Sequence, residues 1–331
     1  MIHRHIAIYL PLPLPPRRRF VEEILRASKA VADRNRIRIL RILTDGPFHV
    51  AELTGILGLG QSSVSRHLRI LKDAGLVTVR RAGTWAFYSS APAGEDSHAS
   101  RLLGCLREEF AGTDSPDLPA VERALAERRR ETSAFFREIA PEYEERRAAA
   151  FDPTAHMDAL LEVVGRAETL VDLGTGTGLA LRDLARVSAR LIGVDESAEM
   201  LGIARRRIDA RELPEVDLRL GALEHLPLSD GEADVMVANL VLQHIADVRG
   251  VLPEIRRGLA AEGRLVIADL AEHGDEDLRE TLGARWPGFS PPQLVSWLRE
   301  AGFTRVTHRL VSTDSRSLAG PDVVLMEAMK P

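Results

Sequence analysis

Between residues 20 and 74, apolar side chains recur at every third or fourth position, which is the period of amphipathic helices. This spacing predicts four helices, over about 20–32, 37–43, 50–57 and 61–74. Gly58 and Gly60 bound a three-residue turn between the last two helices, and Gly75 follows the fourth as a cap. Two helices joined by so short a turn are typical of a helix-turn-helix.

Beyond Gly75 the period shortens to two, as in β-strands. Residues 76–81 and 84–89 alternate apolar and polar side chains on either side of Gly83, which predicts a two-stranded wing. A further helix is predicted over Ser97–Phe110, with its leucines on one side. That apolar stripe fits a dimer seam and plain core packing equally well.

A long charged helix is predicted from Ala120 to Ala140. Its acidic and basic residues are interleaved, which favours a solvated face over a second nucleic-acid patch. Phe135, Phe136 and Tyr143 then fall on one side of the chain and predict a buried aromatic face.

From residue 169 onward, short apolar strands alternate with helices, which is the pattern of a doubly wound sheet. The predicted strands are 169–173, 190–194, 234–239, 263–269, 304–310 and 323–328. Helices are predicted over Leu179–Val187 and Ser197–Ile208. We therefore expect an α+β winged domain followed by an α/β domain.

Composition agrees with two globular domains. The 331 residues are 45% apolar, enough for two cores, and no window of about 20 apolar residues could span a bilayer. Cys105 is the only cysteine, which excludes an intramolecular disulfide and a multi-cysteine metal site. We expect a soluble, cytoplasmic chain with no metal and no membrane partner.

Residues 1–19 stand apart from the predicted domains. Four prolines break a short apolar run, and Arg17–Arg19 follow that run, whereas a signal peptide carries its positive charges ahead of the apolar segment. We interpret this stretch as a disordered leader or an extension upstream of the true start.

Charge is divided unevenly along the chain. Residues 15–90 hold fourteen Lys and Arg against six Asp and Glu, a net charge of +8, although the whole chain carries −5. A basic module joined to an acidic one predicts a polyanion partner for the first.

The fourth predicted helix and the wing carry side chains that suit double-stranded DNA. Arg and Gln hydrogen-bond base edges, and serine hydroxyls suit phosphates. The predicted DNA-binding residues are Gln61, Ser62, Ser63, Ser65, Arg66, His67, Arg69, Arg80 and Arg81.

Residues 171–178 read VDLGTGTG, so glycines lie where a strand meets a helix and allow positive φ and close approach of a ligand. Asp195 ends the next predicted strand and is placed to accept hydrogen bonds from ribose hydroxyls. A nucleotide-like ligand is therefore predicted. NAD-binding turns carry G-x-G-x-x-G, and the spacing here is D-x-G-x-G-x-G.

Residues 30–40 (AVADRNRIRIL), 61–68 (QSSVSRHL) and 72–77 (KDAGLV) resemble the ArsR/SmtB repressors. The resemblance implies a homodimer that binds operator DNA. The cysteine motif of the metal-sensing members is replaced by FHVAEL at 48–53, so the effector is expected to be neither arsenite nor zinc. His49 is interpreted as a surface residue and not as a ligand.

The glycine-rich run resembles motif I of class I S-adenosylmethionine (SAM) methyltransferases, which favours SAM over NAD. Residues 221–227 (GALEHLP) resemble the adenine-side loop, and residues 135–143 resemble the segment that covers the cofactor pocket, with core packing as the alternative. The resemblance implies a Rossmann-like seven-stranded sheet binding SAM or S-adenosylhomocysteine (SAH). The implied cofactor-binding residues are Asp172, Gly174, Thr175, Gly176, Gly178, Asp195, Glu196, Ala222, Leu223, Asn239 and Tyr143. Family loops often carry an acid where Ala222 stands.

These patterns divide the chain into four parts: a leader (1–19), a winged-helix domain (20–111), a linker and helical cap (112–150) and a methyltransferase domain (151–331).

Methyl transfer needs alignment and, for some acceptors, a base. His244 is predicted as that base, with a capping or solvated role as the alternative. Other residues expected on the substrate side are Asn239, Asp269, His273, Arg279, Arg285 and Trp286. Leu240 follows Asn239 where DNA amino-methyltransferases carry N-P-P-[YF], so a small-molecule acceptor is favoured.

Two hypotheses follow from the sequence. The chain is either a DNA-tethered enzyme that methylates a small molecule, or a repressor that reads SAM or SAH without turnover and transmits occupancy to DNA affinity.

Overall fold

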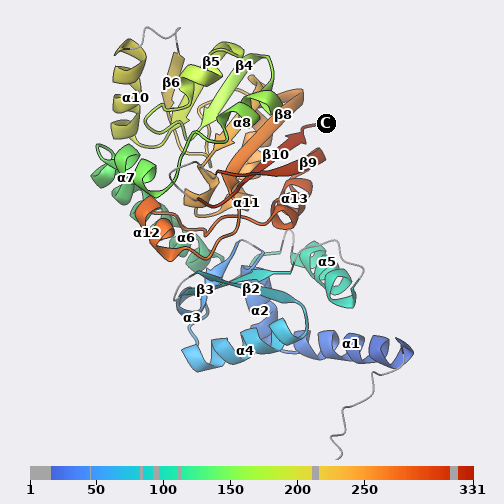
Figure 1. The fold of residues 1–331 in the computed structure, drawn as a ribbon. Coiled ribbons are helices and arrows are strands. Elements are labelled where there is room, and N and C mark those ends of the chain that lie inside the picture. Colours follow the sequence, from blue (N-terminus) through green and yellow to red (C-terminus); the bar gives the residue numbers. More distant parts are fainter. Residues whose placement is uncertain are drawn as a thin grey trace, which may run out of the picture.

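The computed structural model describes residues 16–44, 46–82, 85–91, 97–110, 113–210, 216–313 and 320–331. A winged-helix domain and a sheet domain lie at opposite ends of the molecule (Figure 1). Two helices, α6 (Leu118–Ile139) and α7 (Tyr143–Ala150), lead from the first to the second. No helix in the described residues is long and apolar enough to cross a membrane.

The N-terminal domain contains five helices and three short strands among the described residues. They are α1 (Pro16–Val31), α2 (Arg34–Ile42), β1 (Phe48–His49), α3 (Val50–Leu57), α4 (Gln61–Asp73), β2 (Val77–Ala82), β3 (Trp85–Ser90) and α5 (His98–Phe110). The strands form an antiparallel sheet in the order β1-β3-β2. The predicted helix-turn-helix and wing are confirmed, and β1 is an addition that the sequence pattern did not indicate.

Helix α1 begins at Pro16, so residues 16–19, which the sequence assigned to the leader, are helical. Proline is well tolerated in the first turn of a helix, because the N–H that it lacks has no partner there. Residues 1–15 lie outside the described part of the chain.

Local capping explains where the helices of the N-terminal domain begin and end. The side chain of Asp33 accepts a hydrogen bond from the Arg36 N–H and starts α2. His49 and Glu52 form a capping box at the start of α3. Gly58 ends α3 at φ 67°, a left-handed conformation that glycine adopts without strain. The chain therefore turns within three residues and enters α4.

The core of the N-terminal domain lies between its helices and extends beyond them. Leu40, Leu53 and Leu68 are fully buried there, and Leu103 of α5 joins them. Val121 of α6 is part of the same cluster. The apolar side of α5 thus packs into the core, and the long helix α6 is fixed to the winged-helix domain at its N-terminal end.

The C-terminal domain is a seven-stranded sheet between helices. Its elements are α8 (Met157–Val164), β4 (Ala167–Leu173), α9 (Leu181–Leu184), β5 (Ser188–Asp195), α10 (Ala198–Ala210), β6 (Val216–Leu220), β7 (Ala233–Asn239), η1 (Leu242–His244), α11 (Val248–Gly258), β8 (Leu259–Leu270), α12 (Glu276–Leu282), α13 (Pro291–Glu300), β9 (Thr304–Val311) and β10 (Val323–Met329). The strand order is β6-β5-β4-β7-β8-β10-β9, with β10 antiparallel to both neighbours.

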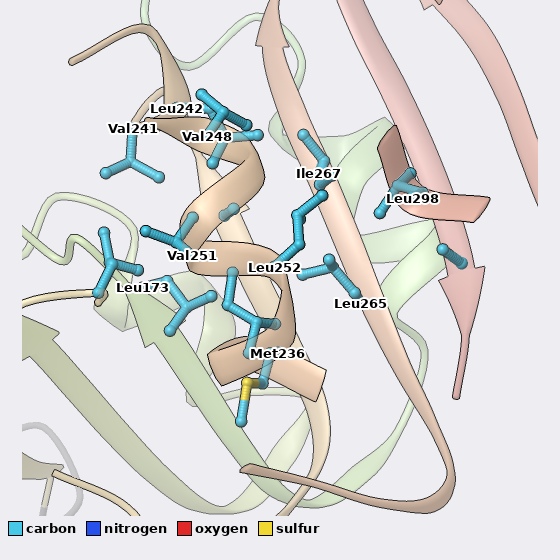
Figure 2. Packing of buried hydrophobic residues seen from close by; sticks show 14 of the residues in the cluster. Leu173, Met236, Val241, Leu242, Val248, Val251, Leu252, Leu265, Ile267 and Leu298 are labelled. Atoms are coloured by element: carbon cyan, nitrogen blue, oxygen red, sulfur yellow. The ribbon is translucent and has the colours of Figure 1, made fainter. Parts of the chain in front are cut away.

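The central strands β4, β5, β7 and β8 carry runs of consecutive buried residues, as expected for strands covered on both faces. Separate apolar clusters lie on the two faces. In one of them, Val251 and Leu252 of α11 pack against Met236, Leu265 and Ile267 of the sheet (Figure 2). The parallel strands β4, β5 and β7 end at the same edge, where the site lies.

The helix predicted over residues 179–187 is wrong in length. Helix α9 spans only Leu181–Leu184 and is capped at Ala185, since the chain already begins β5 at Ser188. The helical segment that joins the glycine turn to β5 is therefore short.

Candidate functional site

The glycine-rich turn joins the end of β4 to α9. Gly174, Gly176 and Gly178 have φ of 67°, 55° and 77°, a region that other residues rarely adopt. A Cβ added at Gly174 would lie 2.2 Å from Cγ2 of Val241. One at Gly178 would lie 2.9 Å from Cδ1 of Leu181. These positions of the turn therefore require glycine.

Asp195 ties the turn to the end of β5. Its carboxylate accepts hydrogen bonds from the backbone N–H of Gly176 at 2.8 Å and of Ser197 at 2.9 Å. Burial raises the pKa of Asp195 to about 6, although these two N–H groups favour the ionised form. The carboxylate is held in one orientation at the edge where the strands end.

Asp172 lies beneath the turn. It is almost completely buried, and its carboxyl accepts a 2.7 Å hydrogen bond from the Thr175 hydroxyl. Burial, with the nearby charge of Asp195, raises the pKa of Asp172 to about 7, while the Thr175 bond opposes the rise. Asp172 thus fixes the conformation of the turn from inside the sheet.

A cavity lies between this turn and helices α6 and α7. Its walls include predicted cofactor-binding residues, namely Asp172, Gly174, Thr175, Gly176, Asp195, Glu196, Leu223, Asn239 and Tyr143. Two predicted residues are not in its walls. Ala222 is absent from the wall, although its neighbours Gly221 and Leu223 are part of it. Gly178 packs against Leu181 and Ala204. Gly178 shapes the turn without lining the cavity.

The aromatic segment at the end of α6 both packs and lines the cavity. The Phe136 ring meets the His244 ring edge-on with centroids 4.8 Å apart, and it meets the Tyr143 ring at 5.3 Å. Phe136, Tyr143 and His244 are all in the cavity wall. The two interpretations that the sequence left open therefore describe the same residues.

His244 lies in the cavity wall and is buried. Burial lowers its pKa to about 4, so the imidazole is neutral near pH 7. Its Nε2 lies 3.5 Å from the Tyr143 hydroxyl, and its Nδ1 lies 3.5 Å from the Gly283 carbonyl oxygen. A solvated role for His244 is therefore wrong.

Several residues expected on the substrate side lie elsewhere. Asp269 is buried behind the cavity and accepts hydrogen bonds from the N–H groups of Leu270 and Gln243, with its pKa raised by burial to about 7. Trp286 packs in the core and donates to the Ile245 carbonyl.

Arg279 and Arg285 line a second cavity between the domains, and His273 lines neither cavity. Asn239 does line the first cavity, where it shares a 2.6 Å hydrogen bond with His156.

Arg147 of α7 is a cavity residue that the sequence did not single out. Its guanidinium lies 5.2 Å from the centroid of the Tyr143 ring. Among the described residues no carboxylate lies within 4.0 Å of it, and its Nε is buried without a hydrogen-bond partner. The neighbouring Glu144 pairs with Arg207 instead. A run of charges in a helix gave no sign of which arginine faces inward.

Helix α4 lies at the outer end of the winged-helix domain, away from the seven-stranded sheet of the C-terminal domain (Figure 1). Gln61, Ser62, Arg66 and Arg69 are exposed on it, and Ser63 and Ser65 are half-buried. The outward placement of His67 is wrong, because its ring is buried with Nδ1 3.8 Å from Asp33. The side chains of Arg80 and Arg81 lie outside the described part of the structure.

A metal site is not found in the described residues, where no group of three or more His, Cys, Asp and Glu side chains could hold an ion. His49 is half-buried and caps α3, a structural role that the sequence left unassigned.

Comparison with known proteins identifies both domains. Residues 33–79 match the family model described as bacterial regulatory protein, arsR family, and residues 171–267 match the model described as methyltransferase domain. The HTH-type transcriptional regulator CmtR of Mycobacterium tuberculosis is 38% identical over 103 residues, which cover 31% of this chain and 84% of that protein. The chain is an ArsR-family protein fused to a class I methyltransferase domain.

The relatives of the methyltransferase half of this ArsR-family fusion are more distant. The arsenite methyltransferase of Halobacterium salinarum is 32% identical over 109 residues, or 32% of this chain and 28% of that enzyme. The chain spans only 30% and 28% of the length of two of its curated relatives, this enzyme included.

Among solved structures, the methyltransferase bound to the Trm112 methyltransferase activator of Haloferax volcanii matches with a TM-score of 0.50 and 21% identity. The match covers 59% of this chain and 97% of that one, and it supports the fold of the C-terminal domain.

Proposed function

We propose that this ArsR-family fusion is a transcriptional regulator that binds double-stranded operator DNA through α4 and binds SAM or SAH in the cavity beside the glycine turn. One observation carries the ligand assignment. Asp195 lines the cavity at the end of β5 with its carboxylate held by the N–H groups of Gly176 and Ser197. An acid at this position is suited to the ribose hydroxyls of an adenosyl group.

The other walls fit an adenosyl amino acid. At Gly174 a side chain would clash with Val241, so the ligand meets bare backbone there, as a closely packed methionyl chain requires. Leu223 gives an apolar wall beside the expected adenine position. Arg147 offers a guanidinium without a carboxylate partner among the described residues, which suits the carboxylate of the amino acid.

The DNA-binding role rests on the exposed face of α4. Gln61, Arg66 and Arg69 are exposed there, in the second helix of the helix-turn-helix. We propose that the chain binds as a homodimer, so that two copies of α4 reach successive half-sites. Because operator DNA is the target, the cytoplasm is the proposed location.

We further propose that the domain methylates a small molecule. When bound, SAM would supply the methyl group of its sulfonium, and the neutral thioether SAH would be the good leaving group. The acceptor side of the cavity would be lined by Phe136, Tyr143 and His244, which would exclude water from it. His244 is neutral and can take a proton, but with a pKa of about 4 it is a weak base. Suitable acceptors are therefore those that lose a proton readily or need to lose none.

A sensor without turnover is the second candidate, and one observation favours it. Helix α6 carries residues in the cavity wall and also contacts α3 of the helix-turn-helix. A change at the cavity thus has a short route to the DNA-binding domain.

Two measurements test the proposal. Calorimetric titration of the full chain with SAM, SAH and NAD should give saturable binding for SAM or SAH and none for NAD; saturation by NAD alone would overturn the ligand assignment. Incubation with SAM and a broad panel of acceptors should release SAH if the domain turns over. Tight binding without release across the panel would leave the sensor as the function.

A further inference from the structure

Arg128 is an arginine in the middle of α6 that is almost completely buried between the two domains, with 7% of its surface exposed. Its Nε and Nη2 donate to the two carboxylate oxygens of Glu52, both at 2.6 Å. Such a two-point contact fixes the geometry of both side chains. The pair links α6 to α3 of the helix-turn-helix.

The rest of the guanidinium is also engaged. Nη2 donates to the Pro47 carbonyl at 3.0 Å, and Nη1 donates to the Ala246 carbonyl at 3.4 Å. The guanidinium lies 4.7 Å from the centroid of the Phe48 ring. One side chain therefore contacts the start of the winged sheet and the loop that follows η1 at the same time.

Glu52 has a second task in the helix-turn-helix. Its carboxylate accepts a 2.9 Å hydrogen bond from the His49 N–H and closes the capping box of α3. Because three residues separate α3 from α4, the position of Glu52 constrains the placement of α4. A shift of Arg128 is therefore a shift of the first helix of the DNA-binding motif.

The other face of α6 contacts the cavity within one or two turns of Arg128. The Ser133 hydroxyl donates to Oε1 of Glu196 at 2.7 Å, next to Asp195. Arg129 lies 3.7 Å from Glu224, and both residues line the cavity. An adenosyl group beside Asp195 would meet this face of the helix.

We propose that the Arg128–Glu52 pair couples occupancy of the adenosyl cavity to DNA affinity, with α6 as the element that moves. The inference rests on the proposed binding of SAM or SAH and of DNA. Binding energies at the two sites are linked only if ligand and DNA favour different placements of a shared element. Helix α6 is in contact with both domains through named side chains.

A second contact between the domains supplies the matched control. Glu300 of α13 pairs with Arg107 of α5 at 3.3 Å and with Arg249 of α11 at 2.6 Å. None of these residues belongs to α6 or lines the adenosyl cavity. Loss of this contact weakens the same interface without touching the proposed route.

The test measures the affinity of the full chain for a DNA duplex selected from a random-sequence pool, with and without saturating SAH. The ratio of the two affinities is the coupling factor, expected to be about five-fold or more in the wild type. Arg128→Met and Ser133→Ala should bring the factor close to one, and Glu300→Gln should leave it unchanged. Each variant should still bind SAH, and each should still bind DNA in the absence of SAH.

Arg128→Met leaves the half-buried carboxylate of Glu52 without its cationic partner and so destabilises the chain. The double variant Arg128→Met with Glu52→Gln removes both charges and should restore stability, measured by thermal unfolding, while the coupling factor stays near one. Restored stability with lost coupling separates transmission from folding.

The outcomes also separate this inference from the proposed function. A wild type that fails to bind SAH contradicts the proposed function itself. A wild type that binds SAH and DNA with a coupling factor of one overturns the inference alone. The same holds if Arg128→Met and Glu300→Gln change the factor equally.

Discussion

Helix α4 and the glycine turn are built in opposite ways. On α4 the proposed DNA-binding groups are side chains on an exposed face, such as Arg66 and Arg69, above buried Val64 and Leu68. At the glycine turn the proposed ligand-binding surface is backbone, held in positive φ and bound to the carboxyl of the half-buried Asp195. The first surface can change its residues without changing its shape, and the second cannot.

This difference predicts how each region responds to substitution. A change on the exposed face of α4 should lower DNA affinity and leave folding intact. A change in the turn should cost folding and ligand affinity together, because the same backbone conformation serves both. The three predictions below test this contrast in order of expected effect.

The largest effect is expected from Gly174→Ala. The new methyl group would lie 2.2 Å from Cγ2 of Val241, on a residue at φ 67°. We expect a loss of about 2–4 kcal/mol in the free energy of unfolding, from overpacking and backbone strain together. SAH binding should be lost in calorimetric titration. Gly60→Ala at the N-cap of α4 is the control, since nothing lies within 4 Å of its added Cβ and its φ is −68°. Equal losses in the two variants would contradict the account.

A smaller effect, limited to DNA, is expected from Arg66→Ala. Loss of a base or phosphate contact costs about 1–3 kcal/mol, or roughly five- to 150-fold in DNA affinity. SAH affinity and the unfolding free energy should not change. Fluorescence anisotropy with labelled duplex at several salt concentrations measures the effect, and a phosphate contact would also lower the salt slope by about one. Unchanged DNA affinity would remove Arg66 from the interface.

The smallest effect is a pH dependence confined to the cavity. The pKa of Asp195 is about 6, because burial raises it, so its carboxyl is ionised above that pH and protonated below it. Ribose hydroxyls donate better to the ionised form, and SAH affinity should therefore fall by up to about ten-fold between pH 8 and pH 5.

Asp195→Asn should bind SAH weakly and without this pH dependence. Asp172, with its pKa of about 7, titrates nearby, so the same profile is measured in Asp172→Asn. If the pH dependence of SAH affinity disappears in Asp172→Asn and persists in Asp195→Asn, it belongs to Asp172, which contradicts the prediction. Arginine side chains stay protonated over this range, so the arginine contacts of α4 predict no matching change in DNA binding.

The sequence predicted the features that depend on local patterns. The helix-turn-helix follows from the 3.6-residue period and two glycines, and the cavity follows from three glycines and an acid at a strand end. These patterns arise because the backbone itself demands the residues. The seven-stranded sheet was predicted only through the resemblance to known methyltransferases, and the structure confirms it.

What the sequence missed depends on contacts between distant segments. Arg128 was assigned to a solvated face, although it lies three residues after Leu125 and seven after Val121 and thus on their buried side of the helix. Its charge concealed a buried position, because the partner Glu52 lies 76 residues away. His67 was misplaced for the same reason, since Asp33 lies near its ring. Arg147 could not be told from neighbouring arginines without the cavity.

Calorimetric titration of SAH into the full wild-type chain, beside Asp195→Ala and Arg66→Ala, tests the adenosyl cavity most directly. The wild type should bind one SAH per chain, Asp195→Ala should lose this binding while keeping its affinity for DNA, and Arg66→Ala should keep it. Binding of SAH that survives Asp195→Ala unchanged, or the absence of saturable binding in the wild type, would contradict the assignment of the adenosyl cavity.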